Sequence, residues 1–159
     1  MTIVYLGLGS NLGDRSRQLA EARRLLAERG AAVRRASRVH ETEPYGVTDQ
    51  PRFLNQVLEV DWAGSPRQLL ATAKAIEREL GRTPTFRWGP RAIDVDLLLF
   101  GDATVREPDL VIPHPGLRRP FVLVGLRELR PDLAAGLDPS DPPAGSDPAP
   151  GAGGPGAGW

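Results

Sequence analysis

Short apolar runs and apolar–polar alternation identify four strands in the first hundred residues. Successive strand side chains point to opposite faces, so a half-buried strand alternates and a fully buried strand is apolar throughout. Residues 52–62 alternate, whereas residues 2–9 are almost wholly apolar. The predicted strands cover residues 2–9, 32–41, 52–62 and about 92–100, and a short extended segment follows near residues 103–112.

Three other segments are predicted to be helical. The first covers about residues 15–29 and ends at Gly30, a residue suited to helix termination. Its apolar stripe consists of Leu19, Ala22, Leu25 and Leu26. The second begins at the capping box Ser65-Pro66-Arg67-Gln68, with proline at the first helical position, and ends at Gly81. Residues 120–129 form the third.

The order of these elements predicts an α+β fold of the ferredoxin-like βαββαβ type. Two helices separated by a pair of strands suit an antiparallel sheet with helices on one face, here followed by a C-terminal helical addition. A doubly wound fold would need strictly alternating strands and helices. We expect one domain over residues 1–137. Residues 138–159 are rich in Gly, Pro and Ala and are predicted to be a disordered tail.

Composition narrows the classes of function. The 159 residues include 20 basic and 20 acidic side chains, so no net field favours nucleic acid or membrane as a partner. Cysteine is absent, which excludes disulfides and thiolate chemistry. No apolar run is long enough to cross a bilayer, and the N-terminal stretch lacks the features of a signal peptide. A cytoplasmic monomer is expected.

Two aspartates in the last apolar strand are the strongest chemical signal. Asp94 and Asp96 share one strand face with Cα atoms roughly 7 Å apart. Two carboxylates in apolar surroundings need nearby cations. Arg87 and Arg91 lie just upstream, so a structural carboxylate–arginine cluster is one interpretation. A divalent metal site is the other, and the spacing favours it.

Other candidate groups are less specific taken singly. Phe53 and Asn55 project from one face of the third strand and suit a flat heterocycle, although a core ring and a surface amide would show the same pattern. Lys74 and Glu77 are three residues apart on a helix, which favours an ordinary surface ion pair. His114 is held between two prolines, where it could contact phosphate or pack the loop. Together with the arginines, these groups suit phosphoryl transfer.

Four blocks of the sequence resemble the 6-hydroxymethyl-7,8-dihydropterin pyrophosphokinase family. The most specific is the run Arg-Trp-Gly-Pro-Arg-x-Ile-Asp-x-Asp at residues 87–96. The blocks are Tyr5 to Asp14, Thr42 to Asn55, Arg87 to Gly101, and Ile112 to Pro115 with Phe121. The resemblance implies a ferredoxin-like fold and transfer of pyrophosphate from ATP to the pterin hydroxymethyl group, with release of AMP.

The resemblance also implies roles for single residues. Asp94 and Asp96 would hold two Mg²⁺ ions, while Arg82 and Arg91 would steady the transferring group. The pterin would contact Thr42, Pro44, Tyr45, Phe53, Asn55 and Phe121. The ATP side would be formed by Lys74, Glu77, Arg87, Trp88, Arg91, His114 and Arg119.

The chain departs from the family pattern in places. Pro84 stands where many members carry an arginine, in a loop about one residue shorter. Arg118 and Arg119 compete for one role because the stretch from Pro115 to Phe121 is also one residue short. Two other functions fit parts of the pattern: another two-metal phosphoryl or nucleotidyl transferase, and a catalytically silent sheet that binds nucleotide or RNA.

Overall fold

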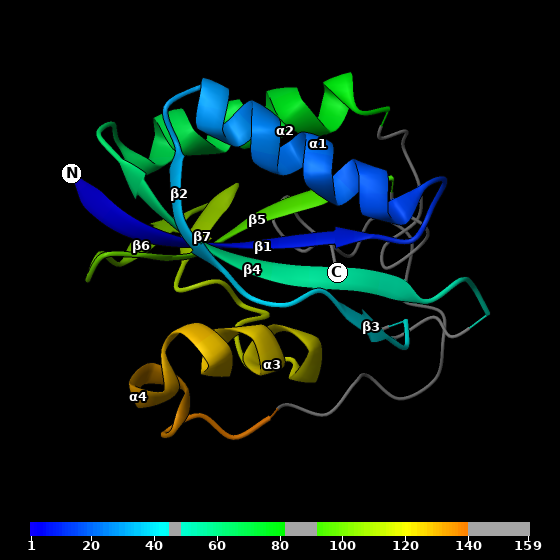
Figure 1. Ribbon diagram of the computed structural model, residues 1–159. Helices are drawn as coiled ribbons and strands as arrows, with labels where there is room; N and C mark the ends of the chain where they lie inside the picture. The colour runs from blue at the N-terminus through cyan, green and yellow to red at the C-terminus, as the bar shows by residue number, and fades with distance from the viewer. Residues whose placement is uncertain (45–48, 82–91, 140–159) are drawn as a thin grey trace.

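A five-stranded antiparallel sheet forms the centre of the protein (Figure 1). The computed structural model describes residues 1–44, 49–81 and 92–139. Four strands lie in the order β2-β4-β1-β5, and β3 pairs with the remaining length of β4. The strands are β1 Thr2–Ser10, β2 Ala32–Ala36, β3 His40–Thr42, β4 Phe53–Trp62 and β5 Asp94–Phe100. A separate hairpin is formed by β6 Val105–Glu107 and β7 Leu110–Ile112.

Helices cover both faces of this sheet (Figure 1). The helices are α1 Arg15–Glu28, α2 Pro66–Glu79, α3 Pro120–Leu129 and α4 Pro131–Ala134. Leu6, Leu58 and Val95 face α1 and α2 and belong to the larger core cluster. Phe53 and Leu98 face the other side, in a second cluster with α3 and α4. The predicted α+β architecture is confirmed, and the C-terminal helical addition covers the sheet face that α1 and α2 leave open.

The predicted strand over residues 32–41 is divided in two, which corrects the prediction from the sequence. The break lies at the buried Ser37. Its Oγ accepts the backbone N–H of Val57 at 2.9 Å, while its own N–H donates to the carbonyl of Val57 at 2.8 Å. A side-chain oxygen thus replaces a backbone acceptor, so the regular ladder stops after Ala36 and resumes at His40. The predicted capping box at Ser65 and Gln68 is present.

A buried polar network fixes the C-terminal helices to the sheet. Glu59, on β4, is 5% exposed and accepts hydrogen bonds from the hydroxyl of Tyr5 at 2.5 Å and the guanidinium of Arg35 at 2.7 Å. Arg35 also donates to the carbonyl of Leu129 at the end of α3, and Arg130 donates to the Tyr5 hydroxyl. The hydrogen bond from Arg35 lowers the pKa of Glu59, against the opposing effect of burial. The network therefore requires an ionised Glu59.

Replacing Glu59 with glutamine is expected to destabilise the fold by about 1.5–3 kcal/mol at neutral pH, because a charge-assisted hydrogen bond is lost in a buried place. The folded-state pKa of Glu59 lies below its unfolded value of about 4.3, so its stabilisation is complete above that pH and disappears as pH falls through the folded pKa. Urea unfolding at several pH values measures this difference, which should shrink below about pH 4.

Glu28→Gln is the matched control, because Glu28 is exposed on α1 and pairs with Arg24 at 2.8 Å. It should change the free energy of unfolding by no more than about 0.5 kcal/mol. Equal effects of the two substitutions would contradict the assignment of a stabilising role to the buried network.

Candidate active site

The strand register brings the two predicted substrate regions onto one face of the sheet. Gly9 on β1 is paired with Asn55 on β4 and also with Asp94 on β5. Residues directly opposite each other in antiparallel strands point to the same face, and adjacent strands lie about 4.8 Å apart. The backbones of Asn55 and Asp94 are therefore roughly 10 Å apart across a residue that has no side chain. Gly7 separates Val57 from Asp96 in the next row in the same way.

Both aspartates are buried on this face. Asp94 is 0% exposed and Asp96 is 5% exposed. No described residue makes a hydrogen bond to the buried Oδ2 of Asp96. A buried acceptor without a hydrogen bond is costly, and a hard cation such as Mg²⁺ takes carboxylate oxygens as ligands. The donor set thus fits Mg²⁺.

The described residues include no group of three or more His, Asp or Glu side chains that could hold a metal together. Mg²⁺ ordinarily binds through one or two carboxylates and completes its octahedral shell with water and substrate phosphates. A pair of aspartates is therefore sufficient protein ligation for Mg²⁺ that arrives with a triphosphate.

His114 faces the aspartate pair from the loop after β7. Its backbone N–H donates to the carbonyl of Leu98 at 3.0 Å, which fixes the loop to β5 two residues beyond Asp96. Its Nδ1 accepts the N–H of Gly116 at 2.8 Å, so the neutral ring carries its proton on Nε2. Nε2 lies 3.6 Å from Oδ1 of Asp96. The ring packs the loop and also presents an N–H donor beside the acidic pair.

Arg118 and Arg119 are both candidates for one ATP-side role, and only Arg119 is buried. Arg119 is 8% exposed, whereas Arg118 is exposed. The guanidinium of Arg119 lies against Gly116, where an added Cβ would come within 2.9 Å of Nε. The buried position is consistent with the ATP-side role that the family resemblance gives to Arg119.

Glu77 and Lys74 do not form the exposed ion pair that their spacing favours. Glu77 is 2% exposed, and its Oε1 lies 3.4 Å from Nζ of Lys74, whose side chain is 32% exposed. Oε2 accepts the backbone N–H of Val95 at 2.8 Å. The surface interpretation is therefore wrong for Glu77. The stripe of buried residues at positions 69, 73 and 77, four apart, was the sequence signal for its burial.

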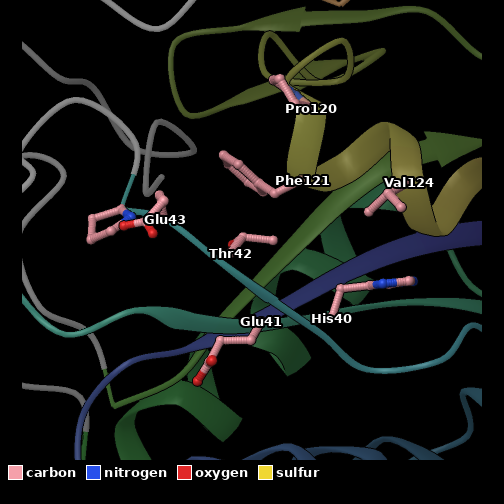
Figure 2. Close-up of a pocket in the computed structure, with 8 residues that line it drawn as sticks. His40, Glu41, Thr42, Glu43, Pro120, Phe121 and Val124 are labelled. Carbon is pink, nitrogen blue, oxygen red and sulfur yellow. The ribbon is translucent and has the colours of Figure 1, made fainter.

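A cavity of about 400 Å³ lies between β3 and the first turn of α3 (Figure 2). Figure 2 shows the ring of Phe121 extending from α3 toward the segment that carries Thr42 and Glu43. The lining residues are His40, Glu41, Thr42, Glu43, Pro44, Pro120, Phe121 and Val124. Three of the residues predicted for the pterin, Thr42, Pro44 and Phe121, thus line one cavity.

Asn55 lies beside this cavity wall, because it is paired with His40, and Phe53 is paired with Thr42. The amide of Asn55 donates through Nδ2 to Oγ1 of Thr42, while no described residue donates to the buried Oδ1. The amide is buried, which excludes the surface asparagine considered from the sequence. Its fixed donor leaves Oδ1 as an acceptor for a polar ligand.

A histidine–glutamate pair connects β3 to α3 where His40 lines the cavity. Nε2 of His40 lies 2.7 Å from Oε1 of Glu128 on α3, and the backbone N–H of Arg38 donates to the other carboxylate oxygen at 2.7 Å. The pair links β3 to α3, the two elements that form the cavity walls. Sequence reasoning missed it, since the two residues are 88 positions apart.

Several predicted site residues lie outside the described residues. These are Tyr45, Arg82, Arg87, Trp88 and Arg91, together with Pro84 and most of the proposed tail. Their predicted roles therefore stay predictions from the sequence.

The proposal of an open RNA-binding sheet does not fit the fold. RNA-binding sheets of this architecture display aromatic residues on an uncovered face. Here α3 covers the face that carries Phe53, and Asp94 and Asp96 place negative charge on it (Figure 1). None of the helices in the described part of the chain has the length and apolar character that a bilayer crossing requires.

Comparison with protein families gives one match over most of the chain. The model described as 7,8-dihydro-6-hydroxymethylpterin-pyrophosphokinase (HPPK) matches residues 5–131. The 2-amino-4-hydroxy-6-hydroxymethyldihydropteridine pyrophosphokinase of Methylorubrum extorquens is 46% identical over 138 residues, which cover 86% of this chain and 87% of that protein. The Bacillus subtilis protein of the same name is 43% identical over 129 residues, covering 80% and 77%.

Some relatives are longer. The mitochondrial folate synthesis bifunctional protein of Pisum sativum is 44% identical over 127 residues, which cover 79% of this chain but only 25% of that protein. The crystal structure of HPPK-DHPS in complex with substrates superposes with a TM-score of 0.69 at 15% identity, over 82% of this chain and 40% of that chain. This structural likeness independently supports the fold.

Proposed function

The chain belongs to the 7,8-dihydro-6-hydroxymethylpterin-pyrophosphokinase family, and we propose that the sheet face carrying Asn55, Asp94 and Asp96 is its active site. The enzyme transfers pyrophosphate from ATP to hydroxymethyldihydropterin in folate synthesis. The observation that carries the proposal is the register of three strands, which aligns Asn55, Gly9 and Asp94 in one row. The pterin and the triphosphate would then meet above Gly9.

The pterin side is formed by the cavity between β3 and α3. An aromatic ring offers its face to a flat heterocycle, and a buried amide oxygen accepts N–H groups from the heterocycle's edge. Phe121 lines the cavity and supplies one ring, and the buried Phe53, paired with Thr42, would supply the second. Asn55 supplies the acceptor, and Thr42 holds that amide in place. The hydroxymethyl group would point along the row toward Asp94.

The phosphate side is formed by Asp94, Asp96, His114 and Arg119. The two aspartates would hold Mg²⁺ that accompanies ATP, and bound Mg²⁺ supplies neutralisation of the triphosphate charge. The Nε2–H of His114 lies 3.6 Å from Oδ1 of Asp96 and would donate to a phosphate oxygen, and the buried guanidinium of Arg119 adds positive charge near the loop that carries His114. These groups orient the triphosphate and exclude water from it.

Three finer features stay predictions. We propose that two Mg²⁺ ions bind, that the enzyme acts as a cytoplasmic monomer, and that residues 1–137 make up the catalytic domain. The first rests on the family resemblance, and a reducing compartment is compatible with a chain that has no cysteine. The family resemblance is also the basis for proposing that the triphosphate contacts Arg82, Arg87, Trp88 and Arg91.

The decisive test is a product assay with purified protein, ATP, Mg²⁺ and 6-hydroxymethyl-7,8-dihydropterin. We expect AMP and the pterin diphosphate in equal amounts, with no turnover after chelation of the metal, because the triphosphate then lacks charge neutralisation. Chromatography of nucleotides and pterins measures both products. Formation of ADP, or release of free pyrophosphate without a pterin product, would contradict the proposed reaction.

A further inference from the structure

Glu77 occupies a position that a helix normally reserves for an apolar residue. It lies four residues after Ala73 and eight after Leu69 on the buried stripe of α2, and it is 2% exposed. A carboxylate in such a place is costly unless it is hydrogen-bonded or paired. Its burial therefore points to a specific hydrogen-bond partner, and that partner lies on β5.

That partner is the backbone N–H of Val95, between the two aspartates. β5 forms one edge of the sheet, since β1 is its neighbour on one side and no strand of the described chain follows on the other. Edge residues alternate between N–H groups that point into the ladder and N–H groups that point outward. The outward N–H of Val95 donates to Oε2 of Glu77 at 2.8 Å. The side chain of Val95 is itself buried, so water does not replace this bond.

We propose that Glu77 is a positioning residue for the acidic pair: by holding the backbone between Asp94 and Asp96, it fixes both carboxylates on the sheet face where the metal binds. The inference rests on the proposed role of the aspartates as metal ligands. Replacement of a group that orients the ligands of a metal site typically lowers metal affinity by about 10–100-fold.

The ion pair between Glu77 and Lys74 is consistent with this role. The carboxylate adds a third negative charge behind the aspartates, and Nζ of Lys74 at 3.4 Å offsets part of it. A neutral amide would keep an oxygen acceptor for the N–H of Val95 but remove the charge. Glutamine and alanine at position 77 therefore separate the hydrogen bond from the charge.

The test uses Mn²⁺ as the probe metal, bound together with α,β-methylene-ATP, which cannot transfer pyrophosphate. We expect Glu77→Ala to weaken Mn²⁺ binding, measured by electron paramagnetic resonance, by about 10–100-fold. Glu77→Gln should stay within about threefold of the parent protein, since the acceptor oxygen is preserved. The binding of the pterin alone should be unchanged in both variants.

Amide hydrogen exchange, followed by NMR without metal or nucleotide, gives an independent measurement. The Val95 amide should exchange at least about tenfold faster in Glu77→Ala, and its neighbours in β5 should follow, because local opening exposes the edge. Glu79→Ala is the matched control: Glu79 belongs to the same helix, but its side chain is 51% exposed and pairs with Arg29. It should alter neither measurement.

The two measurements distinguish failure of the positioning role from failure of the proposed metal site. Unchanged Mn²⁺ affinity and unchanged Val95 exchange in Glu77→Ala would overturn the positioning role. If Val95 exchange rises but Asp96→Asn leaves Mn²⁺ affinity intact, the aspartates are not metal ligands, and the proposed site fails instead. Should Glu77→Ala not fold, Glu77→Gln decides: Mn²⁺ affinity that follows Val95 protection supports the role, and Mn²⁺ affinity lost while Val95 stays protected overturns it.

Discussion

Asp96→Asn is expected to reduce kcat for AMP formation by about 10³-fold, with little change in KM for the pterin. The substitution keeps the shape of the side chain and removes the charge that a divalent cation needs. A loss of about 4 kcal/mol in stabilisation of the reacting phosphates corresponds to that factor. Steady-state kinetics at saturating Mg²⁺ and ATP measure it, and raising the Mg²⁺ concentration should restore only part of the activity.

The fold of this variant should stay intact. Among the described residues, Oδ2 of Asp96 has no hydrogen-bond partner, and Asp94 lies two residues away on the same face. Removing one of two neighbouring buried carboxylates relieves repulsion, so the melting temperature should stay equal or rise.

A suitable control is Asp61→Asn, because Asp61 lies at the far end of β4 and pairs with Arg34 at 3.1 Å. It should retain full activity. Unfolding of Asp96→Asn would support the alternative interpretation from the sequence, a structural cluster of carboxylates and arginines.

The second large effect is expected at Asn55. Replacement with leucine, which is similar in size, should raise KM for the pterin by about 100-fold while leaving the affinity for ATP unchanged. The buried amide has its donor committed to Thr42, so the substitution removes the acceptor and leaves the edge of the pterin unpaired. Fluorescence titration with the pterin, and separately with the nucleotide, measures the two affinities.

Thr42→Val serves as the companion variant. It removes the partner that orients the amide but keeps the amide itself, so the pterin affinity should fall by about three- to tenfold. Equal losses for ATP and pterin in Asn55→Leu, or a large fall in melting temperature, would indicate a general structural role and contradict the proposed contact.

The elements that were predicted well are those whose cause lies in neighbouring residues of the chain. Local patterns predicted β4, α1 and α2 to within a few residues, because periodicity and helix caps depend on neighbours in the chain. They missed the break at Ser37, since its cause is a hydrogen bond to Val57, 20 residues away. The partner of Glu77 was missed for a similar reason: only the packing of α2 on β5 brings its carboxylate to the N–H of Val95.

The sequence by itself determined the fold class, the family and the identity of the candidate residues, because spacing within a strand or motif is a local property. It placed Asp94 and Asp96 on one face and Phe53 and Asn55 on another strand. Only the tertiary structure decided that these pairs meet, through the strand register across Gly9. It also decided that Arg119 rather than Arg118 turns inward, and that Glu77 holds β5. These facts depend on contacts between distant segments, where packing and desolvation, and not local pattern, select the partner.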